Sequence, residues 1–270
     1  MRCEIKGIEI HYEEVGRGKP IVMLHGFSLD HRVMVGCMEP VFSKRGWWRR
    51  IYPDLPGMGK TRGADWISNS DGMLDLVLQF IDEVVGEEGC ALVGESYGGY
   101  LALGAVHRKP EVVKGLLLIC PVVIADPSGR SLPSPATIYR DPELSLDSSG
   151  NGEMFESIAV VQDKVHWQRF QEEVVPGMEA ADSGFLEALQ ADGYPFSFNV
   201  NSTRFSKPTL LLLGRQDSVV GYMDALEMAG NYPRGTMAVL DRAGHDLQIE
   251  QQGLFDALVE DWLARVESES

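Results

Sequence analysis

Short, mostly apolar runs, separated by longer segments of helical character, are the main pattern along this chain. The runs lie at residues 20–24, 50–52, 90–94, 113–119, 208–213 and 236–240. Because side chains alternate between the two faces of a strand, a run that is apolar at successive positions predicts a strand buried on both faces. Strands of this kind are typical of parallel sheets covered by helices.

Segments of helical character follow most of the runs, most clearly in 71–85, where Leu74, Leu78 and Ile81 recur at helical spacing. The others are expected at 30–42, 97–107, 219–229 and 247–266. The first two strands differ, since 4–6 and 9–13 alternate around Gly7 and predict a hairpin. Together these elements predict an α/β fold with a mostly parallel central sheet flanked by helices.

The alternation stops between residues 123 and 205. Residues 126–152 are rich in Pro, Ser and Asp and predict a loop, and helices are expected at 155–175 and 177–190. A connection this long is unusual within one compact domain, so it predicts a separate unit. We therefore expect a core domain formed by 1–122 and 206–270, with 123–205 as a helical cap or lid.

The composition is that of a soluble globular protein, with 44% hydrophobic and 24% charged residues among 270. The formal net charge is −16. A surface this acidic repels phosphate backbones and anionic lipids, so we expect no nucleic-acid and no membrane partner. The expected partner is a small-molecule substrate, and assembly into a homo-oligomer stays open.

The cysteines are scattered along the chain. Cys3, Cys37, Cys90 and Cys120 form no C-x-x-C pair and no spacing typical of zinc sites. This predicts free thiols in a reducing compartment. The first residues lead straight into a strand pattern and no apolar run reaches about 18 residues, so we expect a cytoplasmic location.

The strongest chemical motif is GESYGG at 94–99, which follows a predicted strand and precedes a predicted helix. A tight strand-to-helix turn places the central residue, Ser96, in a strained conformation with its side chain exposed to a substrate. The flanking glycines are needed because backbones cross closely there. The alternative interpretation is a glycine-rich turn with a solvated serine.

A serine nucleophile needs a base, and His245 is the best candidate. It lies in AGHD at 243–246, after a predicted strand. Among the other histidines, only His25 also lies in a loop at a strand end on that side of the sheet. A loop histidine near a helix start is the alternative for His245.

The base needs an acid that orients it, and Asp217 follows the predicted strand 208–213. Ser96, Asp217 and His245 then occur in the chain order expected for a nucleophile elbow of this type. Two alternatives stay open: Asp217 could cap the next helix, and Asp126, beyond the strand 113–119, could be the acid instead.

The developing oxyanion needs two donors. The backbone N–H of Tyr97, directly after the nucleophile, is one candidate. The second is the backbone N–H of Phe27 in HGFS at 25–28, where Gly26 allows a sharp turn. His25 is expected to hold this loop in shape by structural hydrogen bonds.

These motifs resemble the α/β-hydrolase superfamily, in the group with a lid inserted after the sixth strand. The similarity covers 1–122 and 206–270, whereas 123–205 matches no recognisable pattern. The motifs that carry it are HGF at 25–27, DLPGMG at 54–59, GESYGG at 94–99, GRQD at 214–217 and GH at 244–245.

The resemblance implies the α/β-hydrolase fold with a helical cap and a serine hydrolase activity. Nothing in the chain itself suggests a cofactor or a metal. The resemblance also implies a structural role for the loop 54–59, whose GKT tail at 59–61 lacks the spacing of a phosphate-binding loop. The serine at position 96 argues against the haloalkane dehalogenase and epoxide hydrolase branches, which resemble this fold but use an aspartate there.

Several neighbouring residues are expected to be structural. The charges of DHR at 30–32 predict a helix start, Glu95 is predicted to point away from the pocket, and Cys120 with Pro121 is predicted to form pocket wall. The cap aromatics are expected to form mainly the cap's own small core, with some of them lining an apolar pocket over Ser96. They are Tyr139, Phe155, Trp167, Phe170, Phe185, Tyr194, Phe196 and Phe198.

The sequence thus predicts a hydrolase of small esters, thioesters or amides, with carboxylic esters preferred on base rates. A prolyl-type aminopeptidase is the alternative within the same chemistry. A receptor or scaffold that has kept the fold without catalysis is the alternative of another class, although a pure scaffold need not retain all three groups.

Overall fold

A mostly parallel sheet of eight strands forms the centre of the molecule, as predicted. The computed structural model describes residues 1–147, 150–192 and 194–269. The strand order is β1-β2-β4-β3-β5-β6-β9-β10, and only the pairs β1–β2 and β2–β4 are antiparallel. The strands are β1 Arg2–Ile5, β2 Ile8–Val15, β3 Lys19–Leu24, β4 Trp48–Pro53, β5 Cys90–Glu95, β6 Val113–Ile119, β9 Thr209–Gly214 and β10 Gly235–Leu240.

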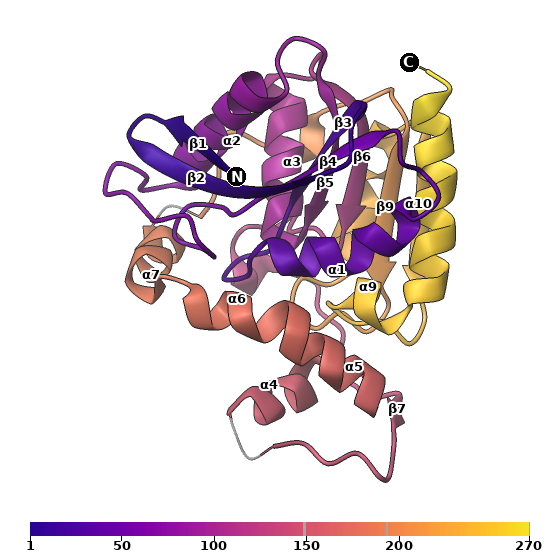
Figure 1. Ribbon diagram of the computed structural model, residues 1–270. Helices are drawn as coiled ribbons and strands as arrows, with labels where there is room; N and C mark the ends of the chain where they lie inside the picture. Colours follow the sequence, from indigo (N-terminus) through magenta and orange to yellow (C-terminus); the bar gives the residue numbers. More distant parts are fainter. Residues whose placement is uncertain (148–149, 193, 270) are drawn as a thin grey trace.

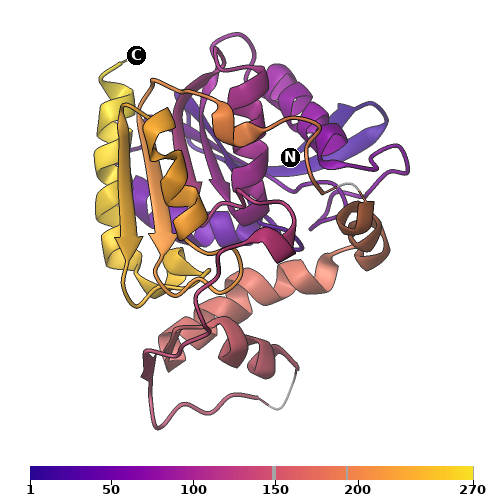
Figure 2. The ribbon, with the colours of Figure 1, turned by 180° about the vertical axis from the view of Figure 1, so that it is seen from behind.

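Helices cover both faces of this sheet (Figures 1 and 2). On one face α1 lies beside α10, and on the other α2 lies beside α3. This arrangement explains why the central strands are apolar at successive positions: both of their faces are buried. The helices outside the segment between β6 and β9 are α1 His31–Phe42, α2 Ser70–Val84, α3 Ser96–Arg108, α8 Met223–Glu227, α9 Leu247–Glu250 and α10 Gln252–Glu267.

Two helices differ from their predicted extents. The helix expected at 219–229 begins only at Met223, because Gly221 has a φ of 75° and turns the chain just before it. The helix expected at 247–266 is divided into α9 and α10 at Gln251, whose φ of −130° and ψ of 44° are not helical. Neither difference changes which faces are buried.

The segment between β6 and β9 extends beyond the end at which the parallel strands finish (Figure 1). Its predicted loop 126–152 contains the two-residue strand β7 Tyr139–Arg140, which pairs with β8, and its residues 148 and 149 lie outside the described part. The elements of this segment are β7, α4 Gly150–Ile158, β8 Val161–Gln162, α5 Lys164–Arg169, a π-helical turn Phe170–Val174, α6 Val175–Ala180 and α7 Ser183–Asp192.

The prediction of one helix over 155–175 is wrong. The chain leaves the helix after Ile158 and resumes it at Lys164, where the Asp163 side chain caps the new helix by accepting from the Val165 and His166 amides. Between these helices, the Val160 and Val161 amides donate to the buried carboxylate of Glu250. A partner distant in sequence therefore satisfies backbone donors that a continuous helix would have used.

The aromatic residues of this segment differ in where they pack, and Tyr139 is exposed. Phe155, Trp167 and Phe170 pack against one another in a separate small core, where the Trp167 and Phe170 rings are stacked. Tyr194 and Phe196 instead pack against Tyr100 of α3, within the main core. In the described part of the chain, no helix is long and apolar enough to cross a membrane.

Candidate active site

Ser96 occupies the turn between β5 and α3, with a φ of 51°. A Cβ on Gly94 would lie 2.3 Å from the Gly98 carbonyl oxygen, and one on Gly98 would lie 2.3 Å from the Leu24 carbonyl oxygen. Only glycine permits these close backbone approaches, so the GESYGG motif has a steric cause. The turn holds Ser96 at the first position of α3 with 8% of its surface exposed.

His245 and Asp217 extend a hydrogen-bonded chain from this serine. His245 Nε2 lies 2.9 Å from Ser96 Oγ, and His245 Nδ1 lies 3.0 Å from Asp217 Oδ2. The loops after β9 and β10 supply these two residues, because neighbouring parallel strands end at the same edge of the sheet. With Nδ1–H donated to Asp217, Nε2 is placed to accept the Ser96 proton.

Asp217 is fully buried, and its second oxygen, Oδ1, accepts hydrogen bonds from the Val219 and Val220 amides. Burial alone would raise the pKa of this carboxyl. The positive charge and hydrogen bond of His245, together with the two amides, outweigh it and lower the pKa below its usual value. Asp217 therefore stays ionised and fixes the imidazole orientation, while it also caps the following turn.

The open alternative, Asp126, lies outside this arrangement. Its side chain is exposed and accepts hydrogen bonds from the amide and hydroxyl of Ser128, which lowers its pKa. It caps a short turn at Pro127–Gly129. The structure thus brings Asp217, and not Asp126, to His245.

The loop after β3 packs against the nucleophile turn. His25 Nδ1 lies 2.8 Å from the Gly26 carbonyl oxygen, and His25 Nε2 accepts a hydrogen bond from the Leu55 amide at 3.0 Å. These contacts agree with the structural role expected for His25. The Phe27 ring lies edge-on to the Tyr97 ring at 5.4 Å, which keeps the two residues expected to stabilise an oxyanion beside each other. Their role as amide donors remains a prediction.

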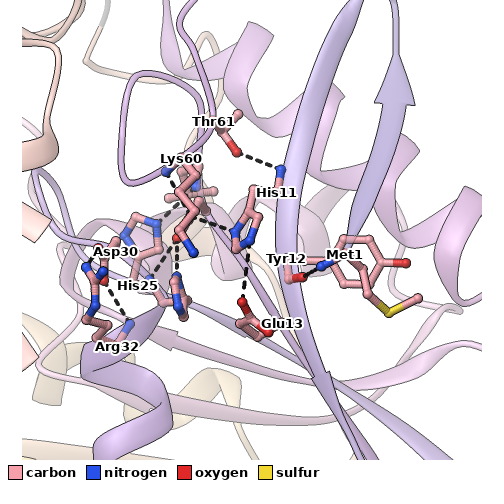
Figure 3. A network of polar contacts seen from close by, with 12 residues as sticks. Met1, His11, Tyr12, Glu13, His25, Asp30, Arg32, Lys60 and Thr61 are labelled. Carbon is pink, nitrogen blue, oxygen red and sulfur yellow. Dashed lines mark hydrogen bonds and ion pairs between the residues drawn. The ribbon is translucent and has the colours of Figure 1, made fainter.

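A polar network lies beside His25 of this loop, and Figure 3 shows its members His11 and Lys60. Asp54 is fully buried and accepts from His11, from His31 and from the Lys60 amide. Although burial raises the pKa of the carboxyl, the histidines and the amide outweigh it and lower the pKa well below its usual range. The loop 54–59 is therefore structural, as its resemblance implied. Asp30 caps α1 through the Arg32 amide, as the charges at 30–32 predicted.

The prediction that Glu95 points away from the site is wrong. Its side chain is buried, with Oε1 3.6 Å from His245 Nε2, and Oε2 has no hydrogen-bond partner within the described ranges. A Cβ on Gly26 would lie 2.3 Å from Glu95 Oε2 and 3.2 Å from Ser96 Cβ. The expectation assumed the side-chain alternation of a straight strand, whereas the sharp turn at Ser96 brings both side chains against Gly26.

Sequence reasoning missed Glu250. It is buried on α9 and accepts from the Gly244 amide as well as from Val160 and Val161. Burial raises its pKa to about 7, although the amides oppose this. Glu250 lies five residues after His245, but no pattern in the local sequence indicates its partners in the segment between β6 and β9.

Two groups of side chains in the described residues bring metal-ligand atoms within 4.8 Å of one another. One consists of His11, His31 and Asp54, and the other of Cys120, Asp217 and His245. In both, the imidazole Nδ1 atoms lie within hydrogen-bond distance of the carboxylate oxygens. The hydrogen bonds account for each cluster without a metal. Cys120 is a buried free thiol.

The profile of the alpha/beta hydrolase family matches residues 21–257. A 2-hydroxymuconate semialdehyde hydrolase of Pseudomonas sp. (strain CF600) is 27% identical over 97% of this chain and 93% of that protein. A pimeloyl-[acyl-carrier protein] methyl ester esterase of Legionella pneumophila (strain Corby) is 26% identical over 95% of this chain and 100% of that protein.

Among solved structures, an alpha/beta superfamily hydrolase from Oenococcus oeni PSU-1 superposes with a TM-score of 0.91 and is 32% identical, with 96% of each chain covered. The family profile spans the nucleophile turn and the loops that carry Asp217 and His245. The fold, the sheet order and these matches agree, and the chain belongs to the alpha/beta hydrolase family.

Proposed function

We propose that this hydrolase cleaves a small-molecule ester through an acyl-enzyme formed on Ser96, with Ser96, His245 and Asp217 acting as a catalytic triad. The observation that carries the proposal is the unbroken hydrogen-bond chain from Ser96 Oγ through both nitrogens of His245 to Asp217. Each group has the geometry that its role requires, because a general base must lie within hydrogen-bond reach of the proton that it takes.

In the acylation step, Ser96 Oγ bonds to the substrate carbonyl carbon while its proton passes to His245 Nε2. The Phe27 and Tyr97 amides stabilise the oxyanion, and Asp217 stabilises the imidazolium. The imidazolium then gives its proton to the leaving alcohol as the ester bond breaks. Water repeats the sequence on the acyl-enzyme and restores Ser96.

The relatives support an ester as the first substrate class to test. Their names include a methyl ester esterase and monoacylglycerol lipases, besides hydrolases of 2-hydroxymuconate semialdehyde and 2-hydroxy-6-oxo-2,4-heptadienoate. A substrate panel should therefore contain acyl esters of graded chain length, a thioester, a dienoate of the kind named and an aminoacyl amide. The amide tests for a prolyl-type aminopeptidase.

Fluorophosphonate labelling followed by intact mass measurement tests the proposal directly. We expect one covalent adduct on the native chain, no adduct on Ser96→Ala, and a loss of ester turnover on the order of 10⁴–10⁶ in that variant. Ester turnover by Ser96→Ala above about a tenth of the native rate would refute the nucleophile. Absence of both labelling and turnover in the native protein would favour a non-catalytic scaffold.

A further inference from the structure

The His245 imidazole contacts a carboxyl group on each side. Asp217 Oδ2 lies 3.0 Å from Nδ1, and Glu95 Oε1 lies 3.6 Å from Nε2, the nitrogen that also faces Ser96 Oγ at 2.9 Å. Nε2 therefore has two neighbours: Ser96 Oγ lies at hydrogen-bond distance and Glu95 Oε1 at ion-pair distance. Asp217 is the acid of the proposed triad, whereas Glu95 has no role in it.

Glu95 is unusually poorly satisfied for a buried carboxyl. Only 1% of its surface is exposed, Oε2 has no hydrogen-bond partner in the described part of the chain, and no Lys or Arg forms an ion pair with it there. Burying an ionised carboxylate without an oppositely charged partner costs free energy. The group must therefore either be protonated or lie beside a protonated neighbour. Apart from the Gly26 amide, which favours the ionised carboxylate and so lowers its pKa, the neighbour within the described residues that can supply a proton is the His245 imidazole.

The neighbouring ionisable groups make Glu95 depend on His245 for a positive charge. The groups that interact with Glu95 include His245, Asp217, Asp246, Cys37, Cys120 and Tyr194. Of these only His245 becomes positive. The nearby Arg169 is already paired with Glu173 through two hydrogen bonds.

We propose that Glu95 is a positioning residue for the general base: its carboxyl group flanks His245 opposite Asp217 and shares one proton with the imidazole, so that the two groups exchange protons with solvent as a unit. The inference rests on the function proposed for Ser96 and His245. In the resting site the shared proton lies on Nε2 and faces Oε1, or lies on the carboxyl and leaves Nε2 free to accept from Ser96. Moving it breaks one N–H bond and forms one O–H bond, with no other reactant.

The pKa values of the two groups agree with this geometry. Burial would lower the pKa of His245, but the charge and hydrogen bond of Asp217, with further contributions from Glu95 and Asp246, raise it to about 9. Burial raises the pKa of Glu95 to about 7, against the opposing charge of His245. Because the two groups interact and titrate together, the two pKa values describe the His245–Glu95 pair and not either residue separately. Removing the Glu95 charge should therefore lower the pKa of the imidazole.

The first experiment measures the proton directly and needs no turnover. The ring nitrogens of His245 are followed by NMR against pH in ¹⁵N-histidine-labelled Ser96→Ala, and assigned by their loss in a His245→Gln variant. In Ser96→Ala with Glu95→Gln, we expect the His245 titration to fall by about 1–3 pH units, as for loss of an adjacent opposite charge. An unchanged titration in the folded double variant overturns the proposal, whatever the enzyme hydrolyses.

The second experiment uses the pH dependence of ester turnover. In Glu95→Gln, the acid limb of kcat/KM should move to lower pH by the same interval, because the base loses its proton earlier. Glu95→Asp keeps the charge and should leave the limb nearer to its native position. If Glu95→Gln instead lowers kcat/KM equally at every pH and leaves the acid limb at its native pH, Glu95 acts through packing alone. That result would overturn the proposed coupling between Glu95 and His245.

Glu250→Gln is the matched control. It also removes a buried carboxyl near His245, but the Glu250 oxygens bind backbone amides and none of these hydrogen bonds reaches the imidazole. We expect the His245 titration to stay in place in this variant, whatever happens to the rate. If both variants lower the pKa of His245 equally, the cause is the general loss of a negative charge. That result would overturn the specific pairing of Glu95 with His245. Failure of the proposed function is separate, since it appears as absent labelling of Ser96.

Discussion

Glu250 Oε1 accepts a hydrogen bond from the Val160 amide at 2.6 Å, and this contact joins the segment between β6 and β9 to the loop that carries His245. The other oxygen of the same carboxylate binds the amide of Gly244, the residue before His245. One buried side chain thus holds both the segment between β6 and β9 and the backbone beside His245.

Replacing Glu250 should loosen both attachments. Glu250→Ala leaves buried amides without an acceptor, at a cost of about 1–3 kcal/mol for each such group. We expect a lower free energy of unfolding, faster hydrogen exchange at Val160 and Val161, and a reduced kcat. Glu260→Ala, an exposed site on α10, is the control. Unchanged exchange at the two valines would show that the carboxylate does not hold the cap.

Asp217 and Asp126, the two candidates for the acid that orients His245, can be tested by the same substitution. Asp217→Asn should keep the fold and lower kcat by roughly 10⁴, because the amide no longer fixes the imidazole tautomer. Asp126→Asn should retain nearly native kcat, since Asp126 is exposed and contacts only its own turn. Steady-state kinetics with circular dichroism checks both, and the opposite ranking would reverse the assignment.

Gly26→Ala tests how tightly the loop after β3 packs on the site. The added Cβ would lie 2.3 Å from Glu95 Oε2 and 3.2 Å from Ser96 Cβ, so the Glu95 carboxyl must move and the Ser96 turn must separate slightly from the loop. We expect fluorophosphonate labelling and kcat to fall at least about tenfold, consistent with displaced donors. Gly46→Ala is the control, because a Cβ there would have no neighbour within 4 Å. Native labelling of Gly26→Ala would contradict the packing.

Glu95→Gln should stabilise the fold at alkaline pH even though it perturbs the base. Because burial raises the pKa of Glu95 from 4.5 to about 7, the folded state holds this proton more tightly than the unfolded state. The resulting penalty is absent below about pH 4.5, grows as the pH rises and is complete above about pH 7. Urea unfolding should show a gain in the free energy of unfolding on the order of 3 kcal/mol at pH 8 and none at pH 4. Equal gains at both pH values would contradict this origin.

The small core of the cap should influence substrate choice. Phe170 is buried between Phe155 and Trp167, so Phe170→Ala leaves a cavity that loosens the cap. We expect KM and the ranking of acyl chain lengths to change more than fluorophosphonate labelling of Ser96 does. A variant with native KM and native ranking would show that this core has no part in recognition.

The sequence by itself determined the sheet, most of its helices and the residues gathered at its carboxyl edge. Apolar runs reveal buried strands because hydrophobic burial is decided residue by residue. The glycines around Ser96 reveal the turn because only they tolerate its close backbone contacts. Ser96, Asp217 and His245 could be named together because parallel strands all deliver their following loops to one edge.

The tertiary structure alone decided the contacts between segments far apart in the chain. It selected Asp217 over Asp126, broke the predicted helix at Val160 and gave Glu250 its partners. It also turned Glu95 towards His245, where the pattern of a straight strand predicted the reverse. Local sequence encodes which residues are buried, but not which distant group meets them, because that depends on how the completed layers pack together.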